Sequence, residues 1–144
     1  MDLEKLQGLY FEDLEEGMYE EFGKTVTDAD IAAFAGVSGD TNPVHLNDEY
    51  AATTMFKKRI AHGMLGASLI SAVIGTKMPG PGCIYVSQNL KFKAPVFVGD
   101  TMIARATVKT MVPEKKFVEL ETVVTVGEKP VIVGEATIMV PSRG

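Results

Sequence analysis

The part of the sequence that most constrains the architecture is HGMLGASLISAVIG, at residues 62–75. It contains no Asp, Glu, Lys or Arg, and small side chains are interspersed among Leu, Ile, Val and Met. A helix that is apolar or small on every side is expected to be buried all round, and its small residues let neighbouring backbone approach closely. In a chain of 144 residues, another element must therefore wrap this helix.

The second half of the chain supplies such an element. Apolar and polar side chains alternate with a period of two, and turn-forming residues separate the alternating stretches, which lie at 84–93, 101–110, 118–126 and 132–140. This pattern is typical of an antiparallel sheet with one buried face. Residues 18–26 add a candidate N-terminal strand. The expected fold class is therefore α+β, with an antiparallel sheet curved around one long central helix.

The length fits a single domain, and the charge is unevenly spread along it. A chain of 144 residues can form a hydrophobic core without the help of disulfides or a bound metal ion. Its net charge of −5 argues against nucleic-acid binding.

Residues 1–30 hold ten acids and two lysines, whereas the remainder holds nine acids and twelve lysines and arginines. We expect an acidic N-terminal arm at residues 1–16 and a domain at 17–144, which is mildly basic from residue 31 onward. Such a domain suits an anionic small molecule, and an ordinary solvated surface explains the charge equally well.

Two further features bear on the compartment. The longest uncharged run, residues 60–76, falls short of the length of a membrane span, and the acidic N-terminus does not resemble a targeting segment. Cys83 is the single cysteine, which excludes an intramolecular disulfide and a cysteine-rich zinc site. We therefore expect a cytoplasmic protein without membrane contact.

The best candidates for acid–base chemistry lie in a turn-rich segment, SGDTNPVH at residues 38–45. Asp40 and His45 are five residues apart across Pro43, so their side chains can converge. A carboxylate beside an imidazole sets the tautomer of the ring, and the two groups together can hold one water. The alternative is that Asp40 and Asn42 are turn-forming residues and His45 is an ordinary polar group at a loop edge.

A second candidate lies where the uncharged helix begins, at His62-Gly63-Met64. The first amides of a helix have no partner within it and carry partial positive charge. Gly63 would let a ligand carbonyl approach these amides, which is the arrangement of an oxyanion hole. The competing interpretation is a glycine required only for tight packing.

These segments together resemble the MaoC-like hydratases, and in particular the (R)-specific enoyl-CoA hydratases. The resemblance is carried by SGDTNPVH at 38–45, RIAHGML at 59–65 and PVFVGDT at 95–101, and it extends over residues 17–140. The Asp-x-Asn-Pro-x-His core followed by His-Gly-Met is specific. The resemblance implies the hot-dog fold, a long central helix wrapped by an antiparallel sheet, in agreement with the pattern of residues.

The resemblance also implies a reaction and roles for individual residues. The reaction is the reversible addition of water to a trans-2-enoyl-CoA, giving an (R)-3-hydroxyacyl-CoA. Asp40 and His45 would hold and activate the water, and the Gly63 amide would stabilise the thioester oxygen as it becomes enolate-like. Asn42 would position the loop. Ser71 would support Asp40 or line the acyl pocket, and the alternative is a packing residue.

The remaining assignments concern the helix and its start. His62 is expected to be a structural histidine that is hydrogen-bonded to backbone. Three apolar side chains are expected to line the acyl-binding pocket or, alternatively, to belong to the core: Met64, Leu65 and Ile74.

We expect no metal and no cofactor. The two histidines are 17 residues apart and lack carboxylate or cysteine neighbours at ligand spacing, and Gly80-Pro81-Gly82 is a turn and not a phosphate loop. The expected partner is an acyl-CoA substrate or an acyl carrier protein thioester, held in part by basic residues, with Lys57, Lys58, Arg59, Lys91 and Lys93 as candidates. The family implies a homodimer.

Two other functions are compatible with the same fold. One is an acyl-CoA thioesterase, which is disfavoured because such sites usually lack the Asp-x-Asn-Pro-x-His loop. The other is a non-catalytic acyl-binding module, which is disfavoured because Asp40 and His45 are both present.

Overall fold

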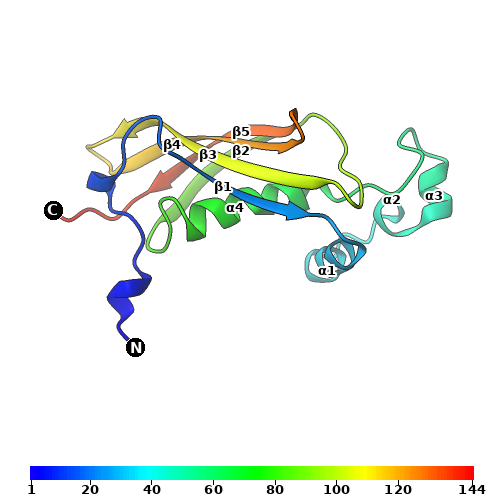
Figure 1. Ribbon diagram of the computed structural model, residues 1–144, viewed down its shortest axis with the longest axis horizontal. Coiled ribbons are helices and arrows are strands. Elements are labelled where there is room, and N and C mark those ends of the chain that lie inside the picture. Colours follow the sequence, from blue (N-terminus) through cyan, green and yellow to red (C-terminus); the bar gives the residue numbers. More distant parts are fainter.

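One antiparallel sheet curves over a single long helix, α4 (Gly63–Thr76), in the computed structural model of residues 1–144 (Figure 1). The strand order is β1-β3-β4-β5-β2, and each pair of neighbours is antiparallel. The strands are β1 (Tyr19–Thr25), β2 (Ile84–Phe92), β3 (Thr101–Val112), β4 (Phe117–Val126) and β5 (Lys129–Met139). The predicted class and the predicted N-terminal strand are both confirmed.

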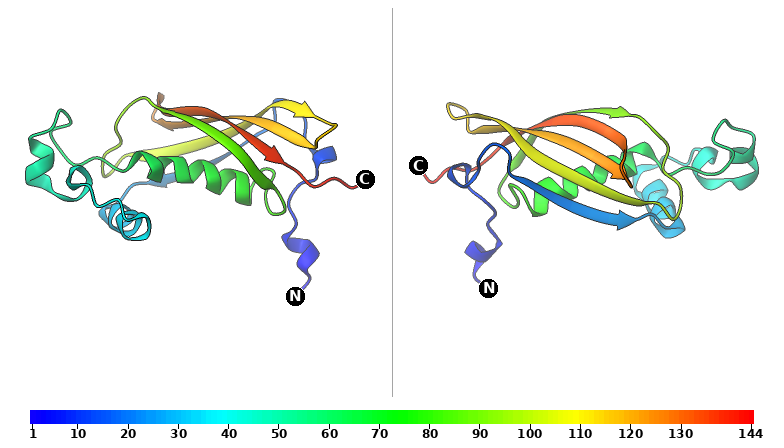
Figure 2. Two further views of the ribbon diagram at one scale, coloured as in Figure 1. Left: turned by 180° about the vertical axis from the view of Figure 1, so that it is seen from behind. Right: turned by 45° about the horizontal axis from the view of Figure 1, so that its top comes forward.

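The other helices are short, and most of them lie beyond one end of the sheet (Figure 2). They are α1 (Asp28–Ser38), α2 (Pro43–Leu46) and α3 (Asp48–Ala52), together with the 3-10 turns η1 (Leu3–Leu6) and η2 (Phe11–Asp13) near the N-terminus. Thr27 caps α1 and forms a reciprocal capping box with Asp30, while Gly39 ends the helix with a φ of 80°. No helix has the length and apolarity needed to cross a membrane.

The core lies between α4 and the concave face of the sheet. Leu69, Ile70 and Val73 are buried on the inner face of α4, against inward-facing residues of β3 and β4 such as Ala106 and Leu120. The outer face of α4 is open. The expectation that this helix is buried all round is therefore wrong for the single chain, because the sheet covers only one side of it.

The residues on that open face share a helical spacing. They are Met64, Ser68, Ser71 and Gly75, which recur every three or four positions and are all exposed. The sheet also has an open edge at β2, which pairs only with β5. The predicted alternation along β2 is interrupted by a bulge between Tyr85 and Ser87.

Only the second half of the expected N-terminal arm packs into the core of the domain. Residues 1–7 are exposed, but Phe11 and Leu14 are buried in the main core. The side chain of Arg143 donates two hydrogen bonds to Asp13, at 2.8 and 2.9 Å, so the arm is tied to the C-terminal tail. The boundary between arm and domain at residue 16 stays a prediction.

Candidate active site

Local hydrogen bonds shape the segment that joins α1 to α2. The Asn42 side chain caps α2 by accepting a hydrogen bond from the Val44 amide at 3.0 Å, and Pro43 occupies the first helical position. Asp40 Oδ1 accepts a hydrogen bond from the Asn42 amide at 3.2 Å. The segment is thus built from side-chain-to-backbone turns, as one of the two interpretations predicted. These turns bring His45, in the one-turn helix α2, back towards Asp40.

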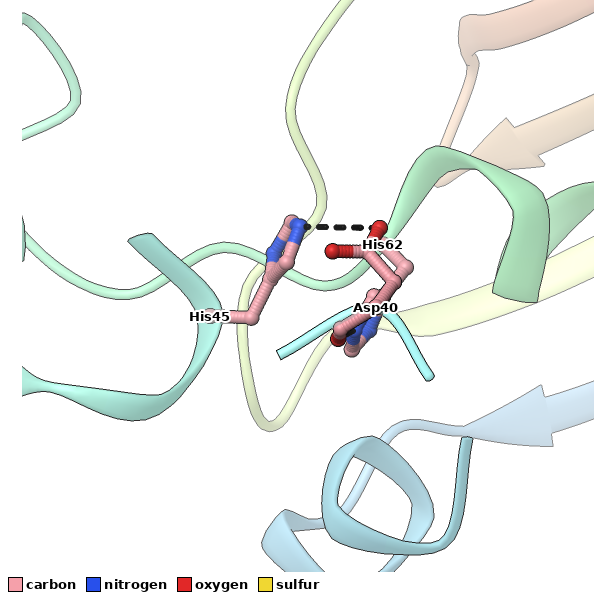
Figure 3. A group of neighbouring side chains, drawn as sticks. All are labelled: Asp40, His45 and His62. Atoms are coloured by element: carbon pink, nitrogen blue, oxygen red, sulfur yellow. Dashed lines mark hydrogen bonds and ion pairs between the residues drawn. The ribbon is translucent and has the colours of Figure 1, made fainter. Parts of the chain in front are cut away.

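The hydrogen bond of His45 to the main chain determines which ring nitrogen is free. His45 Nδ1 lies 2.8 Å from the Ile60 carbonyl oxygen. A carbonyl can only accept, so Nδ1 carries the hydrogen and Nε2 of the neutral ring presents a lone pair. Nε2 lies 4.0 Å from Asp40 Oδ2 (Figure 3). The imidazole is buried, whereas the Asp40 side chain is 50% exposed, so solvent and small molecules can reach the gap.

His62 completes a group of three side chains. Its Nε2 lies 2.9 Å from the Asp40 carbonyl oxygen, and its ring stacks on His45 with centroids 3.8 Å apart and planes at 26°. The expected bond between His62 and backbone is present, but the contacts with the two other residues were not anticipated. A histidine 17 residues from His45 carries no local spacing signal that could have revealed them.

The three side chains offer donor atoms within 4.8 Å of one another, as a metal site would. The ring geometry does not suit one ion. Two planes at 26° with centroids 3.8 Å apart meet roughly 8 Å from the ring centres, whereas a metal bound to an imidazole nitrogen lies about 3 Å from its ring centre, in the ring plane. The lone pairs of His45 and His62 therefore do not converge on a common point.

An apolar cavity adjoins the start of α4. Its volume is about 360 Å³, and its walls include His62, Gly63, Phe92, Met102 and Ile132. The Phe92 ring crosses Gly63 so closely that a Cβ atom there would lie 2.8 Å from it. Because Gly63 has no side chain, the Phe92 ring can lie against the first turn of α4. The first amides of that turn have no hydrogen-bond partner within the helix.

The other predicted residues lie away from this cavity. Leu65 and Ile74 belong to the core, and Met64 is exposed on the open face of α4. Ser71 is also on that face and lies eight residues after Gly63, about 12 Å further along the helix axis. None of these four side chains lines the cavity, because α4 borders it only with Gly63 and Gly66 of its first turn.

Among the candidate basic residues, only Lys93 lines the cavity. Lys58 Nζ lies 4.4 Å from the centre of the Phe97 ring. Arg59 is already engaged, since it donates hydrogen bonds at 2.7 Å to both Asp28 and Asp48. Arg59 is thus part of the structure that holds the short helices together.

The family model described as "MaoC like domain" matches residues 11–130. The chain belongs to the MaoC-like family. Within it, the chain is 62% identical over 135 residues to an (R)-specific enoyl-CoA hydratase of Rhodospirillum rubrum, covering 94% of each sequence. It is 45% identical to a 3-hydroxybutyryl-CoA dehydratase of Methylorubrum extorquens, covering 98% of this chain and 90% of the relative.

Solved structures of MaoC-like proteins have the same architecture. The R-hydratase PhaJ1 from Pseudomonas aeruginosa superposes with a TM-score of 0.90 at 46% identity, covering 96% of this chain and 89% of that one. An (R)-hydratase from A. caviae superposes with a TM-score of 0.86 at 43% identity, covering 89% and 98%. The fold is the hot-dog fold, as the resemblance implied.

Proposed function

We propose that this chain is an (R)-specific enoyl-CoA hydratase that adds water reversibly to trans-2-enoyl-CoA, with Asp40 and His45 as the catalytic pair. The observation that carries the proposal is the lone pair of His45 Nε2 facing the Asp40 carboxylate at 4.0 Å. The relatives named as (R)-specific enoyl-CoA hydratases support the substrate class and the stereochemistry.

The gap between the two groups suits one water molecule. The carboxylate and the neutral Nε2 both accept hydrogen bonds, so they need a shared donor between them. A water that donates one hydrogen to each, at about 2.8 Å, would span roughly 4.4 Å because of its own bond angle. The 4.0 Å separation is close to this span. The lone pairs of such a water remain free to face the substrate.

The proposed hydration step conserves atoms and charge. The water oxygen forms a bond to C3 of the enoyl group while one of its protons passes to the Asp40–His45 pair. The π electrons of the C2–C3 bond move towards the thioester oxygen, which gives an enolate. The pair then returns a proton to C2, so that H and OH have been added across the double bond. Two interacting groups share their protons, so the pair is treated as one acid–base unit.

The first turn of α4 is the proposed site for the thioester oxygen. The Gly63 amide would donate a hydrogen bond to the developing enolate, and the partial positive charge of the helix terminus would add to it. The adjacent apolar cavity would take the acyl chain, with Lys93 at its wall near the anionic carrier. Asn42 would position the pair by capping α2. Either CoA or acyl carrier protein can supply the thioester.

The test is the loss of enoyl absorbance when the protein is mixed with crotonyl-CoA, followed by chiral analysis of the product. Asp40→Asn and His45→Gln should each lower turnover by at least about 10²-fold, because each replaces a group that can take up and return a proton by an amide that cannot. Glu49→Gln, at an exposed carboxylate of α3, is the matched control and should be fully active. Near-native turnover by a folded Asp40→Asn or His45→Gln protein would exclude the catalytic assignment.

The same assay separates the other candidate functions. Release of free thiol without hydration would indicate a thioesterase, and saturable binding without turnover would indicate an acyl-binding module. Either result contradicts the proposal.

We further propose that the protein is a homodimer in the cytoplasm. The edge strand β2 exposes Ile84 and Val86, and α4 has an open face, so a second copy can cover both. Met64 and Ser71 would line the acyl site only in this dimer. Light scattering should give twice the chain mass of 15.5 kDa, and a monomer at all concentrations would contradict this.

The proposed location in the cytoplasm is compatible with the single thiol of Cys83, because free thiols persist in a reducing compartment. Cell fractionation would test this location.

A further inference from the structure

We propose that His62 is a positioning residue for the hydration reaction, which holds Asp40 and His45 at the separation that one water can bridge. This inference rests on the proposed function. It is drawn from three contacts of His62, to Asp40, to His45 and to the first turn of α4.

The first contact fixes the main chain of Asp40. The hydrogen bond from His62 Nε2 to the Asp40 carbonyl oxygen is 2.9 Å long. The Asp40 side chain is half exposed, and the amide of Asp40 is bonded only to the exposed Ser38 hydroxyl, at 3.1 Å. The bond from His62 is therefore the buried anchor of this loop, and together with the bond from the Asn42 amide to Oδ1 it determines where the carboxylate lies.

The second contact fixes the ring of His45. The His62 ring stacks on His45 with centroids 3.8 Å apart, and Phe34 packs against His62 at 4.9 Å (Figure 3 shows the two histidines with Asp40). The three rings form a column that begins in α1. When His45 takes a proton from the water, the resulting cation lies against the face of a neutral aromatic ring, which is an attractive arrangement.

The hydrogen bond of His62 also fixes its tautomer. Its Nε2 donates to the Asp40 carbonyl, so Nδ1 of the neutral ring carries no hydrogen, and Nδ1 is enclosed without any hydrogen-bond partner. The one polar contact of the ring is thus the contact that holds Asp40.

The third contact links the pair to the proposed oxyanion site. His62 is the N-terminal cap residue of α4, and Gly63 follows it directly. One residue therefore connects the bridging water, through Asp40 and His45, to the amide that would bind the thioester oxygen. A shift of about 1 Å in such an arrangement can lower the rate by about 10²-fold.

Two variants separate the contacts of His62. His62→Gln retains an N–H donor that can reach the Asp40 carbonyl but loses the stacked ring, and His62→Phe retains the ring but loses the donor. We expect each to lower kcat for crotonyl-CoA by about 10- to 100-fold while KM changes by less than about threefold. Glu49→Gln, at an exposed position of α3, is the control and should keep full activity. Unchanged kcat in both folded His62 variants would overturn the proposal.

A double variant distinguishes positioning from a general role in folding. In the Asp40→Asn protein the pair is already broken, so adding His62→Phe should lower the residual rate by less than about twofold. A further loss as large as in the wild type would mean that His62 acts by another route. If Asp40→Asn itself is fully active, the proposed function fails and this inference fails with it, whereas a loss of activity in Asp40→Asn with none in the His62 variants overturns this inference alone.

A spectroscopic measurement tests the geometry without turnover. The chain has only two histidines, so both ring spectra can be assigned by nitrogen-15 NMR. We expect the Nδ1–H tautomer at His45 and the Nε2–H tautomer at His62. The opposite tautomer at His62 would remove the proposed bond to Asp40 and contradict the inference, even if a variant fails to fold.

Discussion

Gly63 is the residue at which, under the proposed function, the approach of a substrate would depend on a missing side chain. An added methyl group would lie 2.8 Å from the exposed ring of Phe92, which can swing aside, so the fold should survive. The methyl group would instead occupy the entrance between the cavity and the first turn of α4.

We therefore predict that Gly63→Ala lowers kcat/KM for crotonyl-CoA by at least about tenfold, with a nearly unchanged melting temperature. Gly36→Ala is the matched control. Nothing lies within 4 Å of a Cβ at Gly36 in α1, so this change should be active and slightly stabilising, by about 0.5 kcal/mol. Full activity of Gly63→Ala would show that the first turn of α4 is not where the substrate binds.

The sequence predicted some of these residues and not others, for reasons that differ. Asp40 and His45 are close in sequence across a proline turn, so local geometry alone brought them together. His62 reaches them only through the path of residues 46–61, and that path depends on long-range contacts such as the bond from the Ala61 amide to the Val96 carbonyl, at 2.7 Å. No local pattern encodes such a contact.

At the scale of elements, Arg59 holds the three short helices together. It bonds Asp28 of α1 and Asp48 of α3, and it donates to the His45 carbonyl of α2 at 3.3 Å. Lysine has a single ammonium group and lacks the planar set of N–H donors with which the guanidinium group reaches all three acceptors. Both carboxylates are largely exposed, so the bonds contribute little to overall stability.

We predict that Arg59→Lys changes the free energy of unfolding by less than about 1 kcal/mol but lowers kcat several-fold, because α2 carries His45. Urea denaturation and crotonyl-CoA turnover measure the two effects. Arg105→Lys, which weakens an exposed pair with Glu21 between β1 and β3, serves as the control and should leave kcat unchanged. Equal kcat values for the two variants would contradict this role of Arg59.

Strand β2 carries a group with an unusual titration. Burial, and to a smaller extent the neighbouring Cys83, raises the pKa of Tyr85 from 10.0 to about 12. Between these values the unfolded chain loses the Tyr85 proton while the folded protein retains it. The contribution to stability is therefore complete below pH 10 and is lost as the pH rises towards 12.

The corresponding prediction is that Tyr85→Phe reduces the loss of stability between pH 10 and pH 12, as measured by denaturation at each pH. Tyr50→Phe, at an exposed position of α3, is the control and should follow the wild type. Identical pH profiles for wild type and Tyr85→Phe would show that Tyr85 is not protected from ionisation.

The elements themselves were largely predictable because their signals are local. The capping box at Thr27 and the alternation in residues 101–110 required no knowledge of distant contacts. The open face of α4 was not predictable in this way. Small residues such as Ser71 and Gly75 favour close approach by a neighbour, but they do not say whether that neighbour is the sheet of the same chain.

In the molecule as a whole, the N-terminal segment is fastened to the opposite end of the chain. Phe11 is buried in the main core, its amide donates to the Pro141 carbonyl at 2.8 Å, and Arg143 pairs with Asp13. The first six residues contribute no buried side chain. Stability should therefore depend on residues 9–14 and not on the terminus itself.

We predict that Phe11→Ala lowers the free energy of unfolding by about 3 kcal/mol, since it leaves a cavity in the core. Removal of residues 1–6 should change it by less than about 0.5 kcal/mol. Urea denaturation of the Phe11→Ala protein and of the truncated protein gives the two free energies of unfolding. If the truncation has the larger effect, residues 1–6 and not Phe11 stabilise the protein, which contradicts the prediction.

The water-binding pair and the apolar cavity come from different parts of the chain. Asp40 and His45 lie in the segment between α1 and α3, whereas Met102 and Ile132 of the cavity wall belong to β3 and β5. Under the proposed function, mutations in the sheet would therefore change which acyl chains are accepted while the chemical step is conserved. In evolution, such modularity would allow duplicated copies of one ancestral enzyme to diverge towards short or long substrates without inventing the reaction again.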